Sequence, residues 1–344
     1  MLLRNTILKS PNGVQYVILN QIHESKSSII YEAVVKVEIP GESMKKQYAI
    51  KVSKPGKVFG DIIKAEANKM KYIKEQLGEI PKNNLVAYQQ HFILEDSVYI
   101  VMELLSNCLY DFMKKHLSNK VGFPLKLVRF AARNILDSLI CFQSLNLVHG
   151  DISPTNILFD LVSQELKLID FKSCHSFIEV QYETFQYIYY RAPEVVLRIH
   201  HDSRVDIWSL GCLLLEMFLF FPFFIANDES QLLHQIVRMI GEFPKSMIDR
   251  TNYRKSFFDD NGHLLSIEAL YHESYPTVSV ASSIFTTASI RETIMKYSPR
   301  LNNENEIDTR ESFADFIEHC LILDPEQRFH ATDAIKHPFI VSEI

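Results

Sequence analysis

A short segment near the middle of the chain carries side chains that suit the handling of phosphate and magnesium. Residues 149–156 read HGDISPTN, and Asp170 follows nineteen residues after Asp151. Phosphoryl transfer from ATP needs one carboxylate that orients the attacking hydroxyl, and an amide and a second carboxylate that hold Mg²⁺. Magnesium prefers such oxygen ligands. We therefore expect Asp151 to be the catalytic base, and Asn156 and Asp170 to be the metal ligands. The alternative is an ordinary polar turn.

A lysine and a glutamate upstream form a second candidate pair. Residues 48–52 read YAIKV, and strand alternation puts Ala49 and Lys51 on one face. Residues 60–77 have helical spacing, which places Glu66 within an apolar stripe. The other members of this stripe are Ile62, Ile63, Met70, Ile73 and Leu77. A buried carboxylate needs a cation, and Lys51 is the nearest candidate in the sequence. If the helix is rotated instead, Glu66 is exposed.

The elements that must position these residues fall into two groups. Strand-like runs cover residues 14–21, 28–37, 47–52, 85–93 and 98–103. Helical patterns cover residues 60–77, 107–117, 125–145, 205–220, 229–241, 310–321 and 331–336. Residues 243–309 look irregular and polar. Strands followed by helices indicate an α+β protein with a small β-rich lobe and a larger α-helical lobe.

Further motifs give the chain a resemblance to eukaryotic protein kinases. Besides the segments above, residues 192–194 read APE, 206–212 read DIWSLGC and 324–328 read DPEQR. The order and spacing of these pieces resemble the protein-kinase signature set. Small-molecule phosphotransferases share the Asp–Asn–Asp chemistry but lack the scaffold motifs. The resemblance covers residues 16–340.

Three segments point to a group within the kinases. Residues 102–112 read MELLSNCLYDF, 190–194 read YRAPE and 241–248 read GEFPKSMI. Together with an insertion at about 243–309, they resemble the CMGC group. Within that group, the chain is most similar to the dual-specificity tyrosine-regulated and homeodomain-interacting kinase families.

The resemblance implies a bilobal fold with an N-lobe of five antiparallel strands at about 16–102. A hinge follows at about 103–106, and a C-lobe at about 107–340. ATP would lie in the cleft behind Met102–Leu105. The resemblance also implies a salt bridge between Glu194 and Arg328, and it implies that Asp206 caps the backbone of the catalytic loop. The implied nucleotide contacts are Ile22, Ser25, Ser28, Ile30, Ala49, Lys51, Met102, Glu103, Leu105 and Leu158. The implied catalytic residues are Asp151, Lys51, Glu66 and Asn156, with Asn156 and Asp170 holding Mg²⁺.

Several positions depart from the family pattern. The phosphate-covering loop, residues 23–28, reads HESKSS and has no glycine, although glycines let a backbone approach phosphates closely. Ser25, Lys26 and Ser28 are possible donors to phosphate there. Ser153 replaces the catalytic-loop lysine, and Lys172 replaces the glycine after Asp170-Phe171. The Lys172 ammonium is a possible partial substitute for the missing lysine.

Two interpretations of function follow. The first is a protein kinase that transfers the γ-phosphoryl group of Mg-ATP to serine or threonine, with slow turnover. The second is a pseudokinase that acts as a scaffold or allosteric partner. The retained Lys51, Glu66, Asp151, Asn156 and Asp170 favour the first, and the departures above favour the second.

The activation segment lacks the usual phosphate-binding arginines. Gly150 replaces one of them and Ile188 another, so a phosphate on Tyr182 or Thr184 would meet at most Arg191. The sequence therefore predicts a segment that works without phosphorylation, since charge-assisted bonds to a phosphate would be few.

Bulk properties exclude several other classes. A net charge of −6 without a basic block argues against nucleic acid as a partner. Five cysteines without a C-x-x-C pair indicate reduced thiols and a cytoplasmic or nuclear setting. The apolar segment 210–225 is short for a bilayer span and is interrupted by Glu216 and Pro222, so we expect a buried helix and no membrane association. We expect no signal peptide and a monomer whose partners are ATP and protein substrates.

Overall fold

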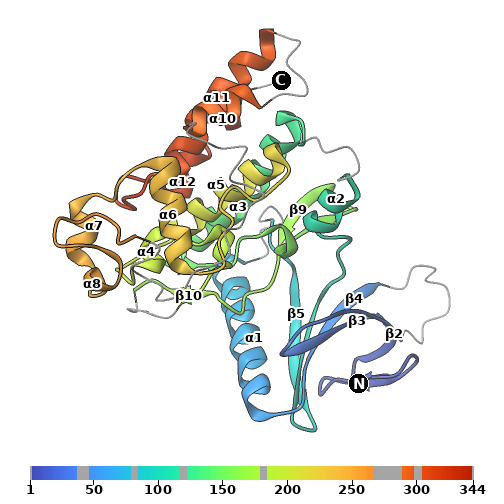
Figure 1. Cartoon of the computed structure of the whole chain (residues 1–344). Helices are drawn as coiled ribbons and strands as arrows, with labels where there is room; N and C mark the ends of the chain where they lie inside the picture. Colours follow the sequence, from blue (N-terminus) through green and yellow to red (C-terminus); the bar gives the residue numbers. More distant parts are fainter. Residues whose placement is uncertain are drawn as a thin grey trace. The chain divides into compact units, whose positions relative to one another are not determined.

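The computed structural model describes residues 2–36, 46–78, 84–116, 122–178, 184–266, 289–297 and 304–342. Its contacts divide the chain into two compact units (Figure 1). The first unit comprises Met1–Asn107 and Leu158–Cys174, and the second comprises Cys108–Ile157 and His175–Ile344. The first is built mainly from strands and the second mainly from helices, so the fold is α+β, as the sequence predicts.

The first unit contains an antiparallel sheet with the strand order β1-β2-β3-β4-β6-β5. Its strands are β1 (Ile7–Lys9), β2 (Gln15–Glu24), β3 (Ser28–Val35), β4 (Gln47–Ser53), β5 (Tyr88–Leu94) and β6 (Ser97–Glu103). All five expected strands are present. The expected count was wrong by one, because β1 pairs with the start of β2 and adds a sixth strand. Only three residues long, β1 carries too little alternation to be recognised in the sequence.

Alternating side chains build the core of this sheet. Tyr16, Ile18, Tyr31, Ala33 and Ile50 are buried together on one face. A separate two-stranded sheet, β8 (Ile157–Asp160) with β9 (Glu165–Leu168), follows later in the chain. It is tied to the same unit by a parallel bridge between Leu85 and Leu168.

The single long helix of the first unit is α1 (Lys57–Leu77). Its buried residues are Ile63, Glu66, Ala67, Met70 and Ile73. The predicted stripe is therefore confirmed at its centre, including the glutamate. It is wrong at Ile62, which is 38% exposed, because Ala67 and not Ile62 continues the buried face.

The second unit is organised around α5 (Arg204–Leu219), which is buried along nearly its whole length. The expected buried helix in the apolar segment is thus confirmed, and it ends at Phe220 in a left-handed conformation. Helices α3 (Leu125–Ser144) and α11 (Glu304–Cys320) both contact α5. Gly211 lets α11 approach, since a β-carbon there would lie 2.9 Å from the Cβ atom of Cys320.

Shorter helices complete the second unit. They are α2 (Leu109–His116), α4 (Pro193–Val196), α6 (Glu229–Ile240), α7 (Lys245–Arg250), α8 (Arg254–Phe257), α10 (Ile290–Lys296), α12 (Ala331–Ala334) and α13 (Pro338–Val341). The expectation that residues 243–309 are irregular was wrong for α7, α8 and α10. These helices have only four to seven residues, which is too short for a clear helical period.

A buried ion pair links α4 to the segment before α12. The Arg328 guanidinium makes two bonds to Glu194, with Nη1–Oε1 at 2.5 Å and Nη2–Oε2 at 2.9 Å. Both side chains are completely buried. Arg328 also donates to the carbonyls of Leu323 and Arg204, at 3.2 and 2.9 Å. The salt bridge that the resemblance implies is therefore confirmed.

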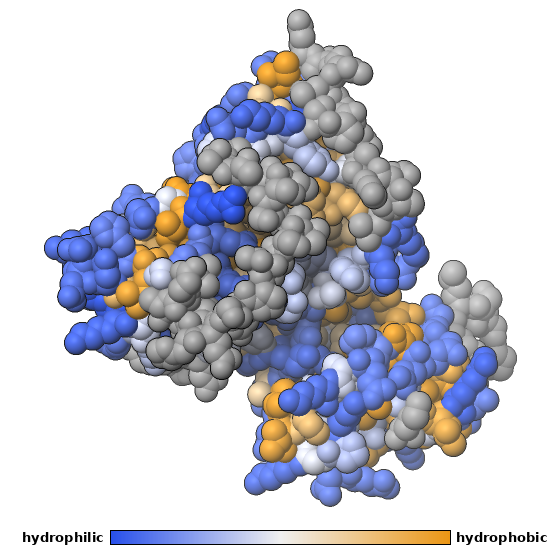
Figure 2. Space-filling view, viewed as in Figure 1, coloured by the Kyte–Doolittle hydropathy of each residue, from blue (hydrophilic) through white to orange (hydrophobic). Residues whose placement is uncertain are grey.

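Among the described residues, no helix combines the length and apolar character needed to cross a bilayer. Figure 2 shows hydrophilic side chains over much of the visible face, with hydrophobic ones gathered in separate groups.

We predict that Arg328→Met destabilises the protein by about 3–5 kcal/mol, because it leaves the Glu194 carboxylate buried without its cation. Urea-induced unfolding would measure the change. As a control, Asp333→Asn removes an exposed pair with Lys336 and should change stability by less than about 0.5 kcal/mol. Equal effects of the two substitutions would contradict the prediction.

Candidate active site

The predicted pair of Lys51 and Glu66 forms in the first unit. Lys51 lies on β4, between Ile30 of β3 and Ile100 of β6, and its Nζ atom is 2.6 Å from Oε1 of Glu66 on α1. Both side chains are nearly inaccessible, at 4% and 2% exposure. Burial lowers the pKa of Lys51, but the carboxylates of Glu66 and Asp170 outweigh it and raise the pKa, so the ammonium stays charged. The second carboxylate oxygen of Glu66 is buried and has no hydrogen-bond partner among the residues that the structure describes.

Asp170 lies between two ammonium groups. Its Oδ1 atom is 3.3 Å from Nζ of Lys51, and its Oδ2 atom is 2.9 Å from Nζ of Lys172. Burial raises the pKa of Asp170, but the two lysines outweigh it and hold the pKa at about 2. The carboxylate is therefore fully ionised at neutral pH. Lys172 is aimed at this carboxylate, so its ammonium pairs with an expected metal ligand.

The predicted nucleotide contacts all belong to the first unit. Ile22 lies on β2, Ser28 and Ile30 on β3, Ala49 and Lys51 on β4, Met102 and Glu103 on β6, Leu158 on β8, with Ser25 in the β2–β3 turn and Leu105 just after β6. Met102 pairs with Ala49 across the sheet, and both are buried, whereas Ile22 is exposed. The sheet thus gathers residues that lie far apart in the sequence.

The glycine-free turn between β2 and β3 is closed by its own serines. The amide of Ser25 donates to the Ser28 carbonyl at 2.8 Å, and the amide of Ser28 donates to Oγ of Ser25 at 3.1 Å. The two hydroxyl oxygens lie 3.1 Å apart. These serines are engaged with each other, which leaves less of their hydrogen-bonding capacity for a phosphate.

Glu103 belongs to a network of three charged residues that was not expected from the sequence. Nζ of Lys167 on β9 lies 2.8 Å from Glu103 and 3.0 Å from Asp160. The Glu103 carboxylate also accepts the Ala87 amide at 2.6 Å. These bonds fix the end of β6, where the nucleotide contacts are expected. The one signal in the sequence is the alternation of polar and apolar residues in β9, which places Lys167 on the face opposite to the two buried leucines.

The second unit holds the predicted catalytic loop. It runs from β7 (Leu147–Val148) through the 3₁₀ turn η2 (Pro154–Asn156) into β8. The Asn156 amide donates to Oδ2 of Asp151 at 2.7 Å and to the Asp151 carbonyl at 2.9 Å. The short strands at both ends confirm the predicted setting of this loop, and the amide fixes the direction of the Asp151 carboxylate.

The central helix α5 binds the backbone of the same loop through Asp206. Oδ2 and Oδ1 of Asp206 accept the amides of His149 and Gly150 at 2.7 and 2.9 Å, so the implied cap is confirmed. Burial raises the pKa of Asp206 to about 7, against the lowering effect of these two amides. Asp206 is completely buried, so its geometry is set by the packing of α5.

Ser153 makes a local contact. Its hydroxyl lies 3.0 Å from that of Thr155, and its side chain is 5% exposed. A hydroxyl engaged in this way replaces little of what a lysine ammonium would supply at this position.

A cavity of about 560 Å³ in the second unit adjoins the catalytic loop. Its lining combines Asp151 and Ser153 with aromatic residues of the segment that precedes α4, namely Tyr187, Tyr189 and Tyr190. The Tyr190 hydroxyl donates to Glu216 at 2.5 Å, and burial raises the pKa of Glu216 to about 6. This bond holds Tyr190, the buried member of this aromatic wall, on the central helix α5.

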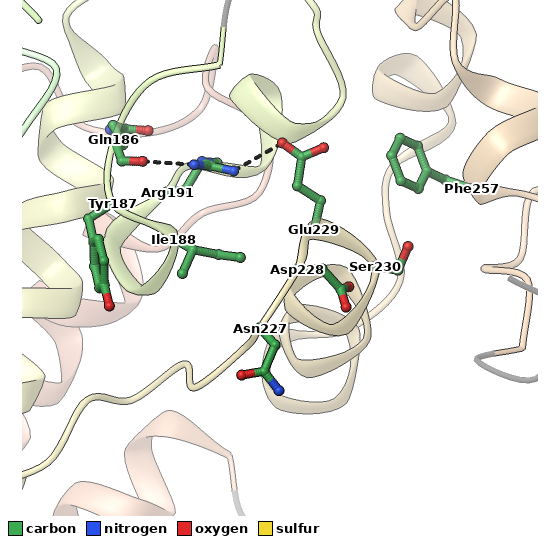
Figure 3. A pocket seen from close by; sticks show the side chains of 9 residues that line it. All are labelled: Gln186, Tyr187, Ile188, Arg191, Asn227, Asp228, Glu229, Ser230 and Phe257. Atoms are coloured by element: carbon green, nitrogen blue, oxygen red, sulfur yellow. Dashed lines mark hydrogen bonds and ion pairs between the residues drawn. The ribbon is translucent and has the colours of Figure 1, made fainter. Parts of the chain in front are cut away.

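A second cavity, of about 570 Å³, lies beside the same segment (Figure 3). On its wall, Nη1 of Arg191 lies 3.0 Å from Glu229, and Nη2 donates to the Gln186 carbonyl at 2.9 Å. The Arg191 Nε atom donates to the Phe185 carbonyl at 3.0 Å. Arg191 thus fixes two successive carbonyls of the segment.

The structure corrects one expectation about this segment. The guanidinium that contacts Thr184 is that of Arg198, whose Nη2 atom lies 3.0 Å from the hydroxyl oxygen. The sequence pointed only to Arg191, because Arg198 lies beyond the APE motif and its approach to Thr184 depends on the fold. Tyr182, the other candidate for phosphorylation, lies outside the described residues.

One group of three potential metal ligands occurs among the described residues, namely Asp315, His319 and His337. Nδ1 of His337 accepts the Phe339 amide at 3.1 Å, so the proton of the neutral ring is on Nε2, which donates to Asp315 at 2.9 Å. Nδ1 of His319 lies 2.8 Å from the Asp315 carbonyl. A ring nitrogen that carries a proton cannot bind a metal. We therefore assign no metal site to this group.

Comparison with known proteins agrees with this geometry. The family described as protein kinase domain matches residues 33–340. The chain is 31% identical to serine/threonine-protein kinase ppk15 of Schizosaccharomyces pombe, over 98% of this chain and 64% of the relative. It is 31% identical to probable serine/threonine-protein kinase dyrk2 of Dictyostelium discoideum, over 86% of this chain and 30% of the relative.

A further relative is DYRK-family kinase pom1 of Schizosaccharomyces pombe, at 29% identity over 75% of this chain and 22% of the relative. The chain thus spans less than two thirds of the length of each of these relatives. The family match covers most of the chain, and relatives that bear the DYRK name agree with the resemblance to that part of the CMGC group. This chain belongs to the protein kinase family.

Proposed function

We propose that this chain is an ATP-dependent protein kinase that transfers a phosphoryl group to serine or threonine of protein substrates. The observation that carries the proposal is the formation of two constellations of predicted residues, one buried and one partly buried. In the first unit, Lys51 is charged and paired with Glu66. In the second unit, the amide of Asn156 fixes the Asp151 carboxylate.

The residues present suit Mg-ATP. Asp170 is ionised, and Asn156 offers its amide oxygen, so both are suitable magnesium ligands. Lys51 offers a charged ammonium that Glu66 holds in place for phosphate oxygens. When bound, Mg-ATP supplies the transferable phosphoryl group and a metal that neutralises its charge. We assign the nucleotide contacts to Ile22, Ser25, Ser28, Ile30, Ala49, Lys51, Met102, Glu103, Leu105 and Leu158.

Asp151 is the proposed base. Its carboxylate is held by Asn156 and faces a cavity large enough for a peptide side chain. There it would orient the substrate hydroxyl and accept its proton. The aromatic wall of Tyr187, Tyr189 and Tyr190 offers a surface for the polypeptide on either side of that hydroxyl. These features support a protein substrate over a small molecule.

A pseudokinase is the second candidate function. Ser25 and Ser28 bind each other, Lys172 occupies an oxygen of Asp170, and Ser153 binds Thr155. Each of these contacts is expected to weaken the binding of phosphate or of the metal ion. We infer slow turnover from them, because none removes a residue of the two constellations.

We further propose that the kinase domain extends over residues 16–340, that the protein acts as a monomer, and that it works in the cytoplasm or nucleus. Its partners would be ATP and protein substrates.

Asp151→Asn tests the proposed chemistry. We expect the variant to fold and to bind nucleotide as the parent does, and to lose about 10²–10⁴-fold in phosphotransfer, because the base is gone. Transfer of labelled phosphate to a generic protein substrate and calorimetric nucleotide binding measure the two effects. Asp249→Asn, at an exposed position, is the control. Unchanged phosphotransfer in Asp151→Asn would remove this residue from its role.

Ser153→Lys tests the inferred slowness. A lysine aimed at the transferred phosphate stabilises charge that develops during the reaction, and one well-placed donor is worth about 10²–10³ in rate. We expect turnover to rise by up to about 10²-fold, since the surroundings did not evolve around a lysine. Ser153→Met has similar length without charge and should not increase turnover. If neither the parent nor Ser153→Lys binds Mg-ATP or transfers phosphate, the pseudokinase interpretation is correct.

Lys172 should weaken magnesium binding at Asp170. Its partly exposed ion pair with Asp170 is worth about 0.5–1 kcal/mol, or about 2–5-fold in affinity. We expect Lys172→Ala to lower the Mg²⁺ concentration needed for nucleotide binding by that factor. Calorimetric titration at several Mg²⁺ concentrations measures it. Lys172→Arg keeps the charge and should resemble the parent; a lower Mg²⁺ requirement in both variants would contradict the explanation.

A further inference from the structure

We propose that Arg198 is a positioning residue that holds the substrate-facing segment 184–191 in place, through Glu229, without a phosphate on that segment. The proposal rests on the proposed kinase function and adds how its substrate site is kept in order.

The backbone of Arg198 first draws attention to this residue. Its φ angle is 52°, in the left-handed region that side chains other than glycine rarely adopt. That conformation is unfavourable for an arginine and persists only where the surroundings enforce it. Here the guanidinium of Arg198 donates to the carbonyls of Val195 and Val196. The side chain therefore folds back onto the turn that follows α4 and stabilises it.

The rest of the guanidinium reaches two other parts of the unit. Nη2 of Arg198 lies 3.0 Å from the hydroxyl of Thr184 and 2.9 Å from Oε2 of Glu229, the first residue of α6. The face of the guanidinium lies 5.7 Å from the ring centroid of Tyr253. One side chain therefore joins the start of the segment to α6.

Glu229 continues the connection to the other end of the segment. Its Oε1 atom lies 3.0 Å from Nη1 of Arg191, whose Nη2 atom binds the Gln186 carbonyl (Figure 3). The Nε atom of Arg191 binds the Phe185 carbonyl. The carboxylate thus bridges two guanidinium groups, and all three side chains are 13–21% exposed. Partial burial protects such a bridge from screening by salt.

In this arrangement, the Glu229 carboxylate binds both arginines, as a phosphate on the segment would. Arg191 donates through all three of its nitrogens, and Arg198 donates to main-chain carbonyls, Thr184 and Glu229. Glu229 supplies the anion from α6, so the segment needs none of its own. The segment also carries Tyr187, Tyr189 and Tyr190, which line the cavity at Asp151. Its order therefore sets the substrate surface.

Arg198→Gly is the test, because glycine accepts the backbone conformation, and the substitution removes the side chain that carries the guanidinium. We expect an unchanged unfolding temperature within a few degrees. Hydrogen exchange at amides 185–191 should become at least tenfold faster. KM for a peptide substrate should rise at least tenfold, with KM for ATP unchanged. Arg198→Lys keeps a charge that can still reach Glu229 and should recover part of the protection.

Matched variants separate the tether from general effects. Asn146→Gly replaces another residue with a left-handed backbone in the same unit, one that is exposed, and should leave both readouts unchanged. Glu229→Gln should loosen the segment at least as much as Arg198→Gly does, because it also weakens the contact with Arg191. The effect of the double variant should be smaller than the sum of the two single effects, since both substitutions remove the Arg198–Glu229 contact. Full additivity, or unchanged exchange in Arg198→Gly, would overturn the proposal.

The phosphorylation state gives a second decisive result. Mass spectrometry of the active protein should show Thr184 largely unmodified, and phosphatase treatment should change neither exchange nor activity. A stoichiometric phosphate on Thr184 or Tyr182 that activity requires would overturn the proposal. Hydrogen exchange tests the tether even if the parent shows no phosphotransfer, so failure of the kinase function and failure of the tether are distinguishable.

Discussion

The carboxylate of Asp206 accepts the amides of His149 and Gly150, and the catalytic loop depends on this one interaction for its position. The carboxylate comes from the most deeply buried helix, α5, whose place is set by apolar packing on several sides. Loops are usually held by few packing contacts. Hydrogen bonds from two successive loop amides to a buried helix therefore restrict the motion of this loop. Asn156 then fixes the Asp151 side chain on that loop. The packed core thus positions the loop backbone, and the loop positions Asp151, the proposed base.

Charge compensation plays the corresponding part in the first unit. Lys51, Glu66 and Asp170 form a buried cluster in which no charge would be tolerated alone. Lys172 extends the cluster by one more cation and leaves Asp170 held on both of its oxygens. The same feature that stabilises this cluster competes with a metal. A glycine at this position would leave that carboxylate oxygen without this cation, which is one physical reason for the slow turnover that we propose.

The segment before α4 shows how a substrate surface can be kept in order by the protein's own charges. Two arginines meet one glutamate, and the segment is held at Thr184 and at the carbonyls of Phe185 and Gln186. Gln186 itself adopts a left-handed conformation, and its side chain is anchored on Val205 and Ser209 of α5. The surface that faces the substrate is therefore connected to the same central helix as the catalytic loop.

Much of this protein follows from local sequence patterns. Period-two alternation gives the five longer strands, and helical spacing places Glu66 inside α1 opposite Lys51. These patterns are visible because burial of one face recurs at every turn or every second residue. The spacing of Asp151, Asn156 and Asp170 likewise identifies the candidate chemistry. The tertiary structure alone decided the pairing of β1, the mutual bonds of Ser25 and Ser28, and the directions of Lys172, Lys167 and Arg198. Long polar side chains have many rotamers of similar energy, and the partner that selects one of them is brought near by the fold, as Glu229 is for Arg198.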